Sequence, residues 1–147
     1  MTASKRVEVR VTRRFDASAE RVFDAFLDPA KARQFFFTAP GGHIVRAEID
    51  ARVGGAFRFV DRRAGEDIEH IGEYLEIDRP RRLVFRFAVP KYDATNTRVT
   101  IEIAALSAGC ELTLTHELSP AWADQKDQTV QGWTMILDGL AAEIGVG

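Results

Sequence analysis

The sequence predicts an α+β domain in which a curved antiparallel sheet of about seven strands wraps around one long C-terminal helix. Three observations predict this architecture. Apolar residues recur every three or four positions over residues 119–144, as on the buried face of an amphipathic helix. Most of the chain before it alternates apolar and polar residues in short stretches, as half-buried strands do. Short turns join these stretches, which favours antiparallel pairing.

Length and charge limit the class of protein. The chain has 147 residues, which favours one domain over residues 1–147. Its 20 basic and 22 acidic residues give a formal charge of −2, which argues against binding nucleic acid or an anionic membrane. The arginine-rich run at 79–82 has acidic neighbours and is expected to be a solvated surface. No apolar run reaches membrane-spanning length, and the first residues lack the apolar core of a signal peptide, so we expect a cytoplasmic protein without membrane insertion.

One strand and two short helices are predicted for the beginning of the chain. Residues 6–15 alternate valine with polar residues. Ser18 is placed to cap the first helix, and the Asp-Pro pair at 28–29 starts the second helix by a cap followed by a proline. This helix ends in the three phenylalanines at 35–37, and the glycines and proline of 38–42 predict a loop.

The next two strands are predicted at residues 44–50 and 56–61. The glycine pair at 54–55 marks a turn or bulge between them, and residues 62–66 form a polar hairpin connection. Asp61 falls in phase with the phenylalanines of its strand. An inward carboxylate is costly unless it is paired, so we expect Asp61 to lie in water at the strand end.

Four further strands complete the predicted sheet, at residues 68–77, 83–88, 99–103 and 112–116. Gly72 lies inside the first of them and suggests a bulge. The single cysteine, Cys110, precedes the last strand in an alternating run and is expected to be a buried small hydrophobe rather than a catalytic thiol.

The closing helix is predicted to run without interruption over residues 119–144. Ser119 is a good N-cap, and Pro120 would occupy the first helical position. At 1.5 Å per residue the helix would be roughly 36 Å long, about the width of a small domain. Its apolar stripe consists of Val130, Trp133, Leu137, Leu140 and Ile144.

This order of elements resembles a known family. Strand, two short helices, six strands and a long helix is the order of the helix-grip fold shared by START, birch-pollen-allergen-like and polyketide-cyclase-like domains, the SRPBCC superfamily. Four local runs are similar to the branch named after the activator of heat-shock-protein-90 ATPase. They are residues 19–26, 50–58, 72–83 and 132–140.

The resemblance implies a hydrophobic cavity between the sheet and the long helix, and it implies no fixed activity. The branch often has a tryptophan near the end of the second short helix, where this chain has Phe35 and Phe36, which changes the pocket wall. The residues expected to line the cavity are Phe36, Phe57, Phe59, His70, Phe85, Phe87, Ile101, Leu114, His116, Trp122, Trp133 and Ile136.

No catalytic residue, cofactor or metal site is predicted. The nucleophile elbow, phosphate loop, dinucleotide fingerprint and zinc-protease motif are missing, and the three histidines form no local metal pair. His116 is expected on the concave side of the sheet with Leu112 and Leu114, and His70 on the same side as Ile68 unless the bulge at Gly72 shifts the phase. Each is either a hydrogen-bonded structural or surface histidine or a polar contact or general acid–base group for a ligand.

The predicted function is binding of a small hydrophobic or aromatic molecule, such as a lipid, sterol, polyketide or flavonoid-like compound. One alternative is a cyclase-like or hydrolase-like enzyme that uses His70, His116 or Tyr74. Another is a chaperone-interaction module, which is weakened because the eukaryotic activators carry an additional N-terminal domain for which this chain has no room. Self-association, as in a homodimer, is compatible with each function and stays open.

Overall fold

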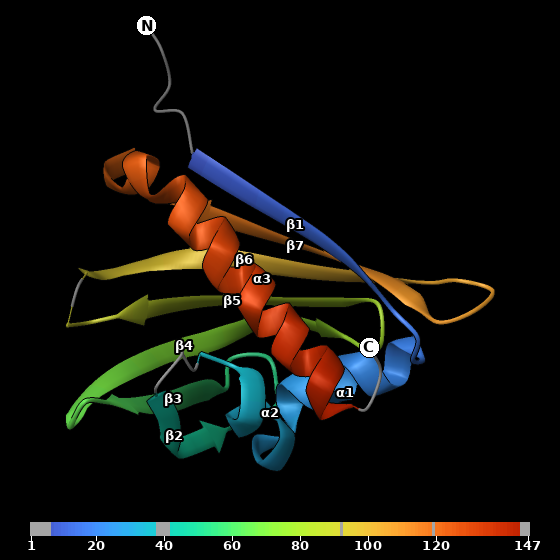
Figure 1. Ribbon diagram of the computed structural model, residues 1–147, viewed down its shortest axis with the longest axis horizontal. Coiled ribbons are helices and arrows are strands. Elements are labelled where there is room, and N and C mark those ends of the chain that lie inside the picture. The colour runs from blue at the N-terminus through green and yellow to red at the C-terminus, as the bar shows by residue number, and fades with distance from the viewer. Residues whose placement is uncertain (1–6, 38–41, 92, 119, 145–147) are drawn as a thin grey trace, which may run out of the picture.

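The computed structural model describes residues 7–37, 42–91, 93–118 and 120–144. Seven strands form one sheet in the order β1-β7-β6-β5-β4-β3-β2, and every neighbouring pair is antiparallel. The strands are β1 Val7–Phe15, β2 Gly42–Ile49, β3 Ala56–Arg63, β4 Glu66–Asp78, β5 Arg82–Val89, β6 Asp93–Ala105 and β7 Cys110–Leu118. The helices are α1 Ala19–Leu27, α2 Pro29–Phe35, the 3-10 helix η1 Pro120–Gln125, and α3 Lys126–Glu143 (Figure 1).

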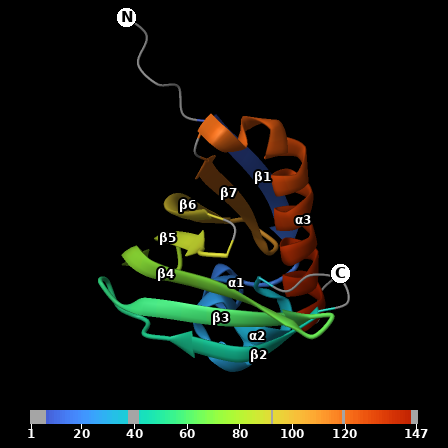
Figure 2. The same ribbon diagram turned by 90° about the vertical axis from the view of Figure 1, so that its left-hand side faces the viewer.

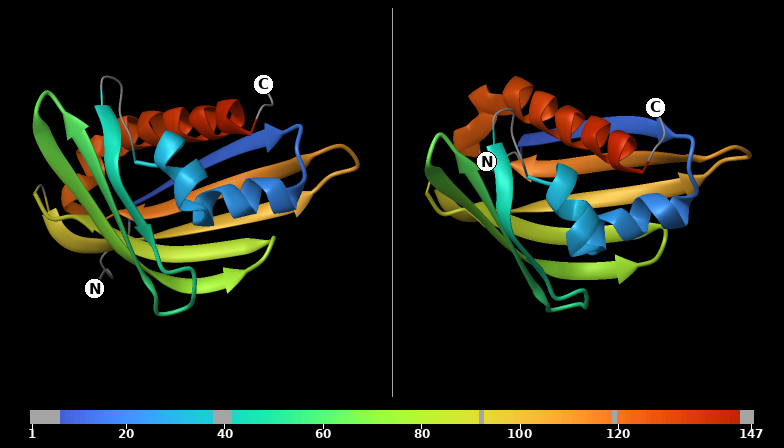
Figure 3. Two further views of the ribbon diagram at one scale, coloured as in Figure 1. Left: turned by 90° about the horizontal axis from the view of Figure 1, so that it is seen from below. Right: turned by 60° about the horizontal axis from the view of Figure 1, so that its bottom comes forward.

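The sheet is curved, and α1, α2 and α3 lie on its concave side (Figure 2). The strands turn steadily from β1 to β2, so that the two ends of the sheet run in different directions (Figure 2). Two further views show α1 and α2 inside the curl, beside α3 (Figure 3). The predicted helix-grip architecture is therefore confirmed.

The core forms where this concave face meets the helices. In β7 every second residue from Cys110 to Leu118 is buried, which is the two-residue period expected of a strand covered on one face. Leu112 and Leu114 of this strand belong to the same buried apolar cluster as Leu137 and Leu140 of α3. Cys110 is fully buried, as predicted.

The starts of the two short helices follow the predicted capping. The side chain of Ser18 accepts a hydrogen bond of 3.1 Å from the backbone N–H of Arg21. The Asp28 carboxylate accepts a bond of 3.0 Å from the N–H of Ala30, and Pro29 occupies the first turn of α2.

The closing helix is shorter than predicted. Residues 120–125 form the tighter η1, and α3 begins only at Lys126, with no side-chain cap at Gln125. Its 18 residues span about 27 Å. Apolar spacings of three and four residues fit a 3-10 turn as well as an α-helix, so the pattern did not reveal the change. The proposed cap, Ser119, lies outside the described residues.

The bulge predicted at Gly72 was wrong. Gly72 pairs regularly with Phe57 on one side and Phe87 on the other, and the irregularity lies between Tyr74 and Glu76. A Cβ atom on Gly72 would approach the ring of Phe57 to 2.3 Å, so this glycine allows close packing across the strands. The β3–β4 connection is also tighter than predicted, because the strands extend to Arg63 and Glu66.

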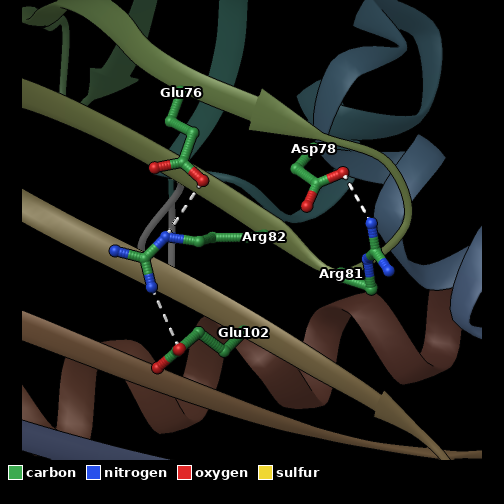
Figure 4. A network of polar contacts seen from close by, with 5 residues as sticks. All are labelled: Glu76, Asp78, Arg81, Arg82 and Glu102. Atoms are coloured by element: carbon green, nitrogen blue, oxygen red, sulfur yellow. Dashed lines mark hydrogen bonds and ion pairs between the residues drawn. The ribbon is translucent and has the colours of Figure 1, made fainter.

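The convex face carries ion pairs that join neighbouring strands. Arg82 of β5 reaches Glu76 of β4 and Glu102 of β6, at 3.1 and 3.0 Å, and Arg81 contacts Asp78 at 3.3 Å (Figure 4). Arg81 and Arg82 are thus paired, with Arg81 exposed and Arg82 half-exposed, as expected of a solvated surface. No helix within the described ranges is both long and apolar enough to cross a membrane.

At the start of the same run, Arg79 makes two hydrogen bonds to Asp24 of α1, at 2.7 and 2.8 Å. Hydrogen bonding to Arg79 lowers the pKa of the Asp24 carboxyl below its usual value. This contact ties α1 to the turn between β4 and β5.

Candidate functional site

All twelve residues expected to line a cavity are buried or half-buried. Three of them, Phe87, Trp122 and Ile136, are half-buried and pack against the core. The other nine are buried: Phe36, Phe57, Phe59, His70, Phe85, Ile101, Leu114, His116 and Trp133. They come from elements far apart in the sequence, which the curl of the sheet brings around α2 and α3.

Aromatic rings form a continuous wall in this interior. Phe36, directly after α2, contacts Phe59 and Phe85 of the sheet with ring centroids 5.4 and 6.0 Å apart. On its other side it contacts Trp133 of α3, at 6.3 Å. These edge-on and tilted contacts are the geometries that aromatic pairs favour, so one ring connects sheet and helix.

Phe37 lies at the centre of the wall and was missed by the sequence analysis. Its ring stacks on Phe36 with centroids 4.0 Å apart and on His70 at 4.7 Å, and it also contacts Trp133. Its backbone φ of 60° is left-handed, which a bulky residue adopts at a cost of about 1–2 kcal/mol. The run of three phenylalanines was interpreted only as the end of the helix, and helical periodicity says nothing about a residue beyond the helix end.

His116 on β7 has a hydrogen-bond partner on each ring nitrogen. The indole N–H of Trp133 donates to Nδ1 at 3.0 Å, and Nε2 lies 2.8 Å from the hydroxyl of Thr97. Because Nδ1 accepts, the neutral ring carries its proton on Nε2 and donates it to Thr97. Burial lowers the pKa of His116 to about 4, so the ring is neutral at pH 7.

His70 on β4 is buried beneath Phe37. Burial and then the positive charge of Arg63 lower the pKa of His70 to about 4, against the opposite effects of Asp61 and of the carbonyl groups of Ile68 and Phe59. Its Nδ1 atom is buried and makes no hydrogen bond with any part of the chain that the structure describes. Unlike His116, this histidine is therefore incompletely paired.

Asp61 on β3 is fully buried, which corrects the expectation that it lies in water. Arg63 donates from Nε to Oδ2, so the charge of the carboxylate is balanced. Its neighbours across the strands are Ile44 and Ile68, and Oδ1 has no hydrogen-bond partner among the described residues. The strand continues two residues beyond its predicted end, which is why Asp61 is covered by both neighbouring strands.

Gly42 of β2 lies against the same carboxylate. A Cβ atom at Gly42 would approach Oδ1 of Asp61 to 2.6 Å. The absence of a side chain there leaves room for the carboxylate on the inner face of the sheet.

Two further titratable side chains of the interior, Cys110 and Tyr74, are buried. Burial raises the pKa of the Cys110 thiol and of the Tyr74 hydroxyl, which keeps both protonated. The described residues contain no cluster of histidine, cysteine, aspartate or glutamate that could hold a metal ion. What remains is an aromatic wall with two neutral imidazoles and one charge-balanced carboxylate.

Comparisons with known proteins agree with this architecture. Protein CV1439 from Chromobacterium violaceum has a similar solved structure, with a TM-score of 0.82 and 30% sequence identity, covering 92% of this chain and 95% of that one. An AHSA1-like protein from Aeromonas hydrophila has a TM-score of 0.81 at 19% identity, covering 94% and 92% of the two chains, a likeness of fold alone. No curated protein matches the chain.

The sequence itself also matches a family model. The model described as "Activator of Hsp90 ATPase homolog 1-like protein" covers residues 16–145, which include the two short helices, β2 to β7 and α3. The match and the shared fold extend over nearly the whole chain. The chain therefore belongs to the family of activator of Hsp90 ATPase homologue 1-like proteins.

Proposed function

We propose that the protein binds a small aromatic or hydrophobic molecule between the sheet and α3, at the twelve residues that line this interior. The observation that carries the proposal is Phe37, a buried ring held in a left-handed backbone conformation at the centre of the aromatic wall. Strained residues of this kind are concentrated at ligand sites and switches, where the strain has a use.

The strained backbone of Phe37 supports a specific way for a ligand to enter the interior. The aromatic rings of the wall are in contact with one another, so a ligand must displace one of them. Withdrawal of Phe37 would relieve about 1–2 kcal/mol of backbone strain, which offsets part of the few kcal/mol lost when a phenylalanine ring is exposed to water. The vacated place would be bordered by Phe36, Phe57 and His70, which stack on Phe37.

This border favours one ligand class among those considered. Stacking partners on several sides suit a flat ring system, as in an aromatic polyketide or a flavonoid-like compound, better than a flexible acyl chain or a thick sterol nucleus. The site would thus accept a planar molecule whose ring replaces that of Phe37.

The proposal is tested by replacing the ring that has to move. Phe37→Ala leaves a ring-sized space, so we expect naphthalene to bind this variant more tightly than the wild type and to raise its unfolding temperature more. Met135→Ala changes an exposed residue of α3 and serves as the control. If no member of a panel of naphthalene, flavonoids, aromatic polyketides, sterols and fatty acids stabilises either the wild type or Phe37→Ala, the proposal is wrong.

A chaperone partner is the second candidate, and membership of the family is the observation that favours it. A pull-down with a purified heat-shock ATPase, followed by a measurement of its ATP hydrolysis, tests this candidate. Unchanged hydrolysis and no retained protein would argue against it.

A further inference from the structure

We propose that Asp61 and His70 form a polar anchor in the interior site, which selects aromatic molecules that carry a hydroxyl group over the same ring system without one. This inference rests on the proposed function and specifies the ligand that the site prefers. It makes Asp61 and His70 binding residues, with His70 in contact with Phe37, the ring that a ligand would displace.

The two side chains share one face of the sheet. His70 pairs with Phe59, and Asp61 pairs with Ile68, so the two residues are diagonal neighbours on β4 and β3. Such neighbours lie roughly 7–8 Å apart. Oδ1 of Asp61 and Nδ1 of His70 are both buried, and within the described part of the chain they pair neither with each other nor with another group.

Unpaired buried polar atoms are rare because each costs the free energy of its lost hydration. Here two of them occur together, and both atoms that need a partner belong to side chains less than one-tenth exposed. A purely structural role would favour pairing them or replacing them with apolar groups. Because both atoms lack a partner, they point instead to a ligand group that forms a hydrogen bond with each of them.

A neutral hydroxyl matches these atoms. It donates its proton to Oδ1 of Asp61 and accepts a hydrogen bond from His70 when the neutral ring carries its proton on Nδ1. Because Arg63 already balances the charge of Asp61 through Oδ2, the anchor has no need of a cation, whose loss of hydration would oppose binding. An ether accepts but cannot donate, so a methoxy group would leave Oδ1 unpaired.

Three probes with one ring system isolate this effect: naphthalene, 2-naphthol and 2-methoxynaphthalene, with binding measured by titration calorimetry. We expect the wild type to bind 2-naphthol about ten-fold or more tightly than 2-methoxynaphthalene, the factor expected of one hydrogen bond to a charged group. Asp61→Asn places an amide N–H₂ where Oδ1 was, because Arg63 holds the remaining oxygen, and should abolish the preference. His70→Phe keeps an aromatic ring beside Phe37 and should reduce the preference for 2-naphthol.

The matched control is Asp67→Asn. Asp67 also pairs with an arginine, Arg62, but on the exposed face of the same hairpin, so the preference should remain as in the wild type. If naphthalene binds and 2-naphthol shows no preference, or if the preference survives in both Asp61→Asn and His70→Phe, the anchor is refuted while the aromatic site stands. If none of the probes binds the wild type or Phe37→Ala, the proposed function fails and the anchor fails with it.

Discussion

At the scale of single residues, His116 and His70 differ although both are buried and neutral. His116 has Trp133 and Thr97 on its two nitrogens, so its burial is compensated within the chain. His70 is stacked on Phe37 but keeps one nitrogen without a described partner. The first is a structural link between β7 and α3, whereas the second keeps a buried nitrogen that no described residue pairs.

Removing the indole N–H tests the structural link. Trp133→Phe keeps a ring in the wall and leaves Nδ1 of His116 buried and unpaired, so we expect a loss of about 1–3 kcal/mol in the free energy of unfolding. Urea unfolding measures this loss. In a background carrying His116→Phe the same substitution should cost distinctly less, and an equal cost in both backgrounds would show that the hydrogen bond does not stabilise the fold.

Stability should also depend on the two buried histidines as the pH falls. Their folded-state pKa of about 4 lies below the ordinary value of 6.5, so between these pH values the unfolded chain binds protons that the folded chain does not. Stability is therefore full above pH 6.5 and decreases on acidification, by roughly 3 kcal/mol for each histidine at pH 4.

Urea unfolding at a series of pH values between 7 and 4 checks this dependence. His70→Phe should flatten the curve, because one titrating group is gone, whereas Met135→Ala, which changes an exposed and uncharged residue of α3, should leave the shape of the curve unchanged. An unaltered curve in His70→Phe would mean that folding does not lower the pKa of His70.

At the scale of elements, the sequence predicted what depends on neighbouring residues and missed what depends on packing. The hydrogen bond that caps α1 joins Ser18 to Arg21, only three residues away, so the cap was predicted correctly from the local sequence. Gly72 was interpreted as a bulge because glycine in a strand can mark either a bulge or a close approach of a neighbouring side chain. Only the position of the Phe57 ring on the next strand distinguishes these two roles. Asp61 was placed in water because its strand was predicted to end there, whereas pairing continues to Arg63.

Two glycines in different elements test this distinction. Gly72→Ala would force a Cβ atom to within 2.3 Å of both the Phe57 ring and a backbone oxygen of Arg86, so we expect a loss of about 1–3 kcal/mol or more in stability. Gly132→Ala in α3 meets nothing within 4 Å and should stabilise the protein by about 0.5–1 kcal/mol through helix propensity.

Thermal and urea unfolding of both variants decide the matter. We expect Gly72→Ala to lower stability and Gly132→Ala to raise it, although both substitutions add the same methyl group. A neutral Gly72→Ala would mean that β3 and β4 move apart easily, in conflict with their regular pairing around Phe57.

At the scale of the whole molecule, strand phase predicted which residues face inward, and it could not predict how they meet. Alternation put Phe57 and Phe59 on one face of their strand and His116 on the concave side with Leu114, and all four side chains are buried. Their contacts depend on the curl of the sheet and on the exit of the chain from α2, which set the positions of Phe36 and Phe37. The polar pair of Asp61 and His70 likewise arises only when β3 and β4 are in register.

Phe36 is the residue through which the layers of the molecule are joined, since its ring contacts Phe26 of α1, Phe59 and Phe85 of the sheet, and Trp133 of α3. Phe36→Ala should therefore cost about 3–5 kcal/mol, a large share of the 5–15 kcal/mol that stabilises a typical domain. Val53→Ala, at a position 61% exposed, is the control and should change stability by less than about 0.5 kcal/mol. Unfolding followed by far-UV circular dichroism and by tryptophan fluorescence should shift together, because sheet and α3 lose the same contact. If the two transitions separated, with α3 released while the sheet stayed folded, the layers would be held together by residues other than Phe36.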